Sequence, residues 1–186
     1  MARINKLDTI KEEPTIGQHC ELPVVLDKTF PPGVYPDRME AILVHQKRWA
    51  NGTKLRYYLF PADEPGLLRH SDETFSWVDF SGNQQSADAV RRAFQTWKNL
   101  GIGLDFEEVY HREEAEIRIG FLQGNGSWSY IGRDILSQSD PNQRTMNFGW
   151  QLSNTGHAFD TALHEIGHTL GLPHEHQNPQ AGIVWD

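Results

Sequence analysis

Three histidines and one glutamate near the end of the chain have the types and spacing of a metal site. The stretch HEIGHTLGLPH occupies residues 164–174. On a helix, His164 and His168 lie one turn apart on a single face, so both imidazoles can reach one cation. Glu165 follows the first histidine and lies beside that pair, where a general base for a water molecule would stand. The spacing therefore predicts a metal-binding helix with a carboxylate next to the metal.

The third histidine needs a break in the helix to reach the same ion. Gly171 has no Cβ, so it can adopt the left-handed conformation that ends a helix, and Pro173 discourages a new helical turn. His174 can then return toward His164 and His168. Three imidazole ligands with a fourth position left open are typical of a catalytic zinc site. The pattern HExxH alone also occurs on solvated helix faces. Gly171 and His174 distinguish a metal site from such a face.

The complete string resembles the zinc signature of the metzincin clan of metallopeptidases, and its continuation through Glu175 is most similar to the astacin branch and its microbial relatives. The resemblance implies a zinc endopeptidase that acts on protein or peptide substrates. It implies His164, His168 and His174 as the zinc ligands and Glu165 as the catalytic base. It also implies secretion, although the first residues lack the apolar core of a signal peptide.

The same resemblance implies the fold and the division of the chain. We expect an α+β fold of the metzincin upper-lobe type, with a mixed twisted sheet, a backing helix and the zinc helix. Residues 1–48, with scattered prolines, are expected to be an N-terminal extension, and residues 49–186 the catalytic domain. The clan places a methionine turn and a lower lobe after the third histidine, whereas all three methionines here precede it. We therefore expect the C-terminal lobe to be missing from this chain.

Two alternatives to an active endopeptidase stay open at this point. Without the lower lobe, the chain could be an inactive zinc-binding fragment. It could also be a latent zymogen in which Cys20, the only cysteine, supplies the fourth zinc ligand, because thiolate binds zinc strongly. A single thiol is more often a small, partly buried side chain without such a role.

Periodicity predicts the elements that position the metal ligands. The zinc helix has an apolar face for a core, formed by Phe159, Leu163, Ile166 and Leu170, opposite the face of His164 and His168. A second helix is predicted at residues 86–100, with Ser86 as a candidate N-cap and Gly101 past its end. The other expectations are a helix at residues 37–49, a polar loop at 61–72, strands at 55–60, 104–109, 115–121 and 145–150, and a strand near Trp128 and Tyr130.

Composition limits the classes of function. The formal net charge of −8 and the lack of basic clusters argue against a nucleic-acid partner. No apolar stretch reaches the length of a transmembrane helix, so no membrane association is expected. The oligomeric state is not predicted by any pattern in the sequence.

Overall fold

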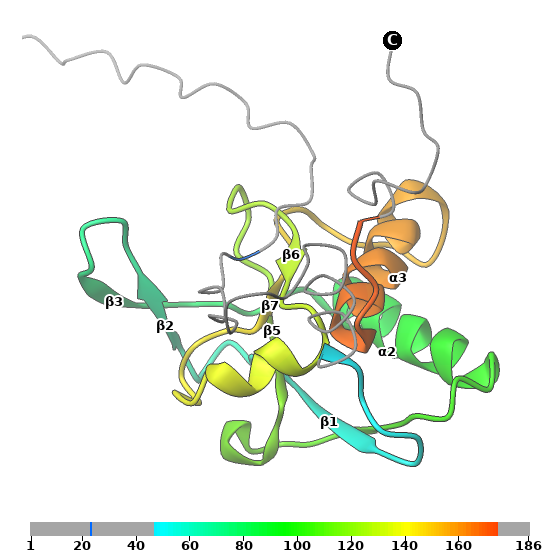
Figure 1. Cartoon of the computed structure of the whole chain (residues 1–186). Coiled ribbons are helices and arrows are strands. Elements are labelled where there is room, and N and C mark those ends of the chain that lie inside the picture. Colours follow the sequence, from blue (N-terminus) through cyan, green and yellow to red (C-terminus); the bar gives the residue numbers. More distant parts are fainter. Residues whose placement is uncertain (1–22, 24–46, 175–186) are drawn as a thin grey trace, which may run out of the picture.

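The computed structural model describes residue 23 and residues 47–174, which form an α+β fold (Figure 1). Five strands make a mixed sheet in the order β4-β1-β5-β7-β6, in which only β6 runs antiparallel to its neighbour. Two further strands, β2 and β3, make a separate antiparallel hairpin. The bounds are β1 (Lys54–Leu59), β2 (Gly66–Arg69), β3 (Phe75–Val78), α2 (Gln84–Asn99), β4 (Asp105–Glu108), η1 (Arg112–Glu114), β5 (Ile117–Gly120), β6 (Trp128–Ser129), η2 (Gly132–Ser137), β7 (Met146–Asn147) and α3 (Gly156–Leu170).

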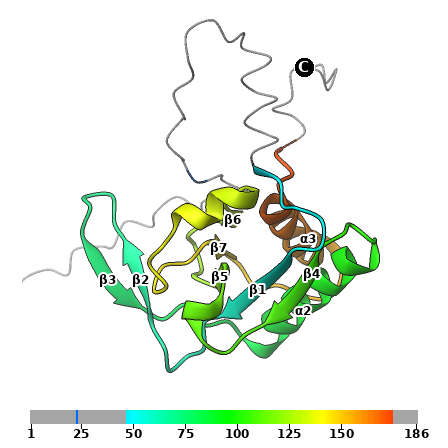
Figure 2. The same cartoon turned by 60° about the horizontal axis from the view of Figure 1, so that its bottom comes forward.

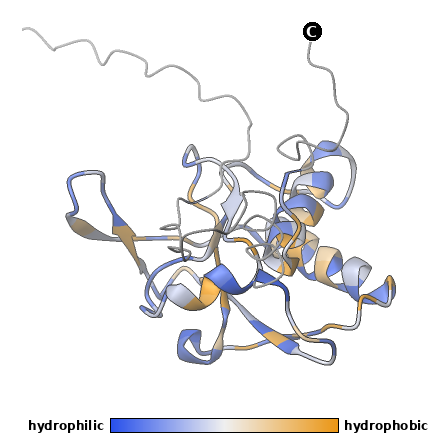
Figure 3. Ribbon diagram, in the orientation of Figure 1, coloured by the Kyte–Doolittle hydropathy of each residue, from blue (hydrophilic) through white to orange (hydrophobic). Residues whose placement is uncertain are grey.

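Alternating side chains of the sheet build two apolar clusters. Along β1, Leu55 and Tyr57 pack into the main core, whereas Tyr58 belongs to the second cluster on the opposite face. The main core lies between the sheet and the helices α2 and α3, and Tyr57 stacks on Phe94 of α2 with ring centroids 4.2 Å apart. Hydrophobic and hydrophilic residues alternate along both helices (Figure 3). Helix α3, which carries the predicted metal ligands His164 and His168, therefore packs on the core of the sheet.

Helix α2 confirms the helix predicted at residues 86–100, but its N-cap is different. The cap is Asn83, whose Oδ1 accepts a hydrogen bond from the backbone N of Ser86 at 2.8 Å. Ser86 lies inside the helix, and its hydroxyl accepts a hydrogen bond from the backbone N of Leu152. Gly101 follows the helix with a φ of +69°, as its position past the end predicts.

The hairpin of β2 and β3 overturns one expectation. The sequence predicts a polar loop at residues 61–72, yet β2 begins at Gly66 and pairs with β3 from Gly66↔Val78 to Arg69↔Phe75. Both strands have only four residues, and prolines and acidic residues precede them, which hides the period-two signal. The hairpin projects from the sheet on the side away from α2 and α3 in both views (Figures 1 and 2).

The other predicted elements are found close to their expected positions. Strands β4, β5, β6 and β7 lie within the segments in which strands are expected, and β1 begins one residue before its expected segment. The helix predicted at residues 37–49 falls almost entirely outside the described residues, as does Cys20, and Arg48 and Trp49 are not helical. The domain boundary at residue 48 stays a prediction. Within the described part of the chain, no helix is both long enough and apolar enough to cross a membrane.

Candidate metal centre

Helix α3 positions two of the three histidines. It begins after Thr155, whose side chain makes no capping hydrogen bond. Ile166 is fully buried in the main core, and Phe159, Leu163 and Leu170 pack against that core. This apolar face fixes the rotation of the helix about its axis. His164 and His168 therefore keep a common direction away from the core, as their spacing predicts.

The end of α3 brings the third histidine back toward the first two. Gly171 has a φ of +103°, in the left-handed region predicted for it. Its backbone N donates to the carbonyl of His168 at 2.8 Å, and the backbone N of Leu172 donates to the carbonyl of Gly167 at 3.1 Å. These two bonds form a Schellman motif, which reverses the chain direction. His174 then lies against the ligand face of α3.

The three imidazoles converge on one point. Their Nε2 atoms lie 3.0 Å apart for His164 and His168, 3.1 Å for His168 and His174, and 3.2 Å for His164 and His174. Tetrahedral zinc with Zn–N bonds of about 2.0–2.1 Å requires N···N separations of about 3.3 Å, so the set is close to that size. Imidazole is a donor that suits zinc, and three such donors leave a fourth coordination position for water or substrate. The residues present fit a zinc ion.

His168 is held in the form and orientation that a metal ligand needs. Its Nδ1 donates to the backbone carbonyl of Leu172 at 2.6 Å, which leaves Nε2 directed at the other two histidines. Burial is the main cause that lowers the pKa of His168 to about 4; the hydrogen bond to the Leu172 carbonyl opposes this fall, and the imidazoles of His164 and His174 contribute to it. The ring is therefore neutral at physiological pH, with the Nε2 lone pair available to a cation.

Glu165 is buried in the same helix as His164 and His168. Its side chain is 0% exposed, and it is the only acidic residue among the buried side chains of residues 47–174. A carboxylate in such a place is seldom kept for stability alone, because removing it from water is costly. Its burial beside three histidines is consistent with a chemical role.

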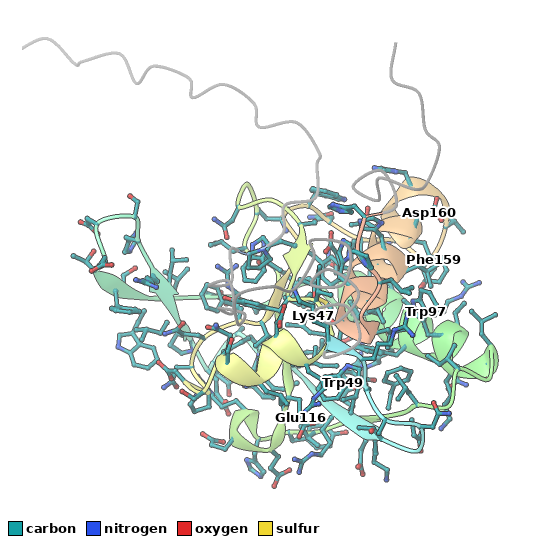
Figure 4. All side chains as sticks on the ribbon, viewed as in Figure 1. Lys47, Trp49, Trp97, Glu116, Phe159 and Asp160 are labelled. Carbon is teal, nitrogen blue, oxygen red and sulfur yellow. The ribbon has the colours of Figure 1, made fainter. Side chains whose placement is uncertain are left out.

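Three side-chain contacts fasten α3 to the surrounding structure. Trp49 Nε1 donates to the carbonyl of Thr169 at 2.8 Å, and Trp97 Nε1 of α2 donates to the carbonyl of Leu163 at 3.0 Å. Figure 4 shows both indoles beside α3. On the sheet side, the hydroxyls of Ser129 and Thr169 are 2.8 Å apart and fully buried. These contacts hold the helix from both sides close to His168.

Strand β6 lies at the edge of the sheet next to α3. It is the last strand in the sheet order, and within residues 47–174 no other strand pairs with its outer edge. Ser129 points toward Thr169 of α3, so the edge is fixed relative to the histidines. A strand at the end of a sheet can receive an extended peptide by strand addition.

The structure gathers all three predicted ligands and buries Glu165 beside them. It leaves His157, two turns earlier, exposed and outside the cluster, as its spacing indicates. Glu175, which carries part of the resemblance, lies outside the described residues. The contacts of Trp49, Trp97 and Ser129 are not predicted by the sequence. Their side chains come from distant parts of the chain, and no spacing in the sequence links them to α3.

Comparisons with known proteins agree with this geometry. The family model described as Astacin, a peptidase family, matches residues 74–182. Zinc metalloproteinase nas-27 of Caenorhabditis elegans is 40% identical over 92 residues, covering 50% of this chain and 19% of the nematode protein. Protein SpAN of Strongylocentrotus purpuratus is 30% identical over 115 residues, covering 60% of this chain and 17% of the sea urchin protein.

A solved structure of myroilysin is also similar, with a TM-score of 0.60 and 33% identity, covering 77% of this chain and 59% of that chain. The chain thus spans about a fifth of the length of the curated relatives and 59% of the solved one. The α+β fold with its mixed sheet and zinc-type helix is that of a metzincin. Because the family model covers more than half of the sequence and the histidine cluster has the size of a zinc site, the chain belongs to the astacin family.

Proposed function

We propose that this chain carries the zinc-binding half of a metalloendopeptidase active site. The observation that supports it most strongly is the triangle of Nε2 atoms, 3.0–3.2 Å on each side, made by His164, His168 and His174. These three residues would be the zinc ligands. A zinc ion held there supplies Lewis-acid chemistry, which polarises a peptide carbonyl and makes water a stronger acid.

Glu165 is the proposed general base. Its buried carboxylate follows the first ligand in α3, so it is held by the same helix turn as His164 and His168. In this role Glu165 accepts a proton from the attacking water and then delivers it to the nitrogen of the leaving amine. The C–N bond breaks as the new C–O bond is completed, and the overall reaction consumes one water molecule per peptide bond.

Strand β6 is the proposed binding edge for the substrate. An extended peptide that pairs with the outer edge of β6 would lie beside α3, because the contact of Ser129 with Thr169 fixes the distance between strand and helix. Backbone pairing holds a peptide without selecting its side chains, so it explains how many sequences can reach the same catalytic groups.

The test compares the wild-type chain with Glu165→Gln and His174→Ala in the same preparation. Zinc content is measured by atomic absorption, and cleavage is measured with a fluorogenic peptide. Wild-type protein is expected to bind zinc and cleave, Glu165→Gln to bind zinc without cleavage, and His174→Ala to lose zinc. Cleavage by Glu165→Gln at the wild-type rate would refute the role of the base. Zinc binding without cleavage by the wild-type chain would favour the alternative of an inactive zinc-binding fragment.

A further inference from the structure

The hairpin of β2 and β3 exposes two large aromatic side chains. Phe75 and Trp77 occupy alternate positions of β3, so both point to the same side of the hairpin, and they are 50% and 61% exposed. On the paired strand, Arg69 faces Phe75 and Leu67 faces Trp77. Figure 3 shows hydrophobic colour on the strands and hydrophilic colour on the turn between them. Exposed aromatic residues grouped in this way are typical of interaction surfaces.

An acidic groove lies at the base of this aromatic face. It has a volume of 670 Å³, and its lining includes Trp77, Asp63, Glu64, Glu113 and Arg112. Three carboxylates and one guanidinium line it together with the imidazole of His111, so the carboxylates outnumber the guanidinium by two. The guanidinium of Arg112 is already engaged, because it donates to Glu64 Oε2 at 3.0 Å and to the carbonyl of Pro65 at 3.0 Å. The groove therefore favours a cation.

We propose that this hairpin and groove form a docking site for a basic, extended segment of a protein substrate, a proposal that rests on the proposed peptidase function. A lysine or arginine side chain of the segment would lie over the indole of Trp77, with its charge between Asp63 and Glu113. Aromatic faces attract cations, and the two carboxylates add Coulomb attraction of the matching sign. A neighbouring apolar side chain of the segment would contact Phe75.

The docking site is joined to the strands that border the metal centre. The backbone N of Leu67 in β2 donates to the carbonyl of Asn142 at 2.8 Å, and Asn142 also lines the groove. The segment that follows Asn142 leads into β7, which pairs with β6. In Figure 2 the hairpin lies on one side of β6 and α3 lies on the other. A protein substrate can therefore occupy the hairpin and the edge strand with different segments.

Binding is tested in the Glu165→Gln background, in which no probe is consumed. The probe is a short fluorescent peptide of alternating lysine and glycine, and the comparison probe replaces lysine with glutamate. Trp77→Ala is expected to weaken binding of the lysine probe about fivefold. Combined Asp63→Lys and Glu113→Lys substitutions are expected to remove detectable binding. The matched controls are Leu100→Ala, an exposed apolar residue after α2, and Glu107→Lys, an exposed acid of β4, and both should bind as the parent does.

Equal binding of the two probes, or a Trp77→Ala variant that binds the lysine probe normally, would overturn the inference. Kinetic measurements distinguish docking at the hairpin from the proposed peptidase activity. On a lysine-rich histone, Trp77→Ala should raise KM about fivefold with kcat unchanged, whereas cleavage of a short neutral peptide should not change. Normal histone cleavage by Trp77→Ala would refute docking and leave the peptidase intact. Absence of Glu165-dependent cleavage of the short peptide would refute the peptidase, and the probe measurements would still decide whether the basic segment binds.

Discussion

Replacement of Gly171 with alanine should weaken zinc binding more than it weakens the fold. Gly171 has a φ of +103°, which an L-residue adopts only at a cost of about 1–2 kcal/mol. A Cβ at this position would meet no atom closer than 3.5 Å, so backbone strain, not crowding, is the cause. For a domain of this size the strain corresponds to a fall in Tm of about 2–8 °C.

The effect on zinc follows from what Gly171 positions. Relief of the strain shifts the turn that carries His174 and the Leu172 carbonyl, which accepts the 2.6 Å hydrogen bond from His168. Disturbing a ligand or the group that orients it costs about 10- to 100-fold in metal affinity. Competition with a chromogenic zinc chelator measures this loss directly.

Gly101→Ala is the matched control. Gly101 also follows a helix with a positive φ of +69°, and a Cβ there would meet nothing within 4 Å. The two variants should therefore lose similar stability, but only Gly171→Ala should lose zinc affinity. If both variants bind zinc equally well, the turn at Gly171 does not position the ligands and the reasoning is wrong.

Two further substitutions test buried polar contacts of the fold. Thr169→Val removes one of two buried hydroxyls in contact and should lower the free energy of unfolding by about 1–2 kcal/mol in urea, whereas an unchanged midpoint would show that the contact with Ser129 adds nothing. The guanidinium of Arg144 donates hydrogen bonds to Asn147 and Asn125 and lies 4.0 Å from the centre of the Phe80 ring. Arg144→Lys keeps the charge but loses this planar group, so the free energy of unfolding should fall by about 1–3 kcal/mol. The control Arg69→Lys, at an exposed arginine, should show no such loss.

Local signals predict the elements that hold the metal ligands. The motif at residues 164–174 predicts the helix, its end at Gly171 and the return of His174, because all of these depend on residues within a few positions of one another. The same holds for α2, whose apolar period and terminal Gly101 are plain in the sequence. The predicted cap is wrong by three positions because Asn83 and Ser86 are both residue types that cap helices well.

Features set by tertiary contacts are not predictable in this way. The alternation of residues in the strand that contains Arg118 predicts an exposed side chain, but Arg118 is buried. Its guanidinium donates to the carbonyls of Gln143, Ala115 and Gln138, which makes this burial possible. Charged residues are rarely buried, and only the fold reveals the carbonyls that compensate Arg118. The hairpin is not predicted for a related reason. Its strands have only four residues each and are stabilised by pairing with each other, so the sequence contains no long alternating pattern that would indicate them.

Zinc content and peptide cleavage, measured together for wild-type protein and Glu165→Gln, are the decisive test of the proposed metal centre. We expect about one zinc ion per chain in both proteins, because Glu165 is not one of the three ligands. We expect cleavage by the wild-type protein alone, because the proposed base is Glu165 and glutamine cannot accept the proton of the attacking water. A Glu165→Gln variant that cleaves at the wild-type rate, or a wild-type chain that binds no zinc, would contradict the assignment.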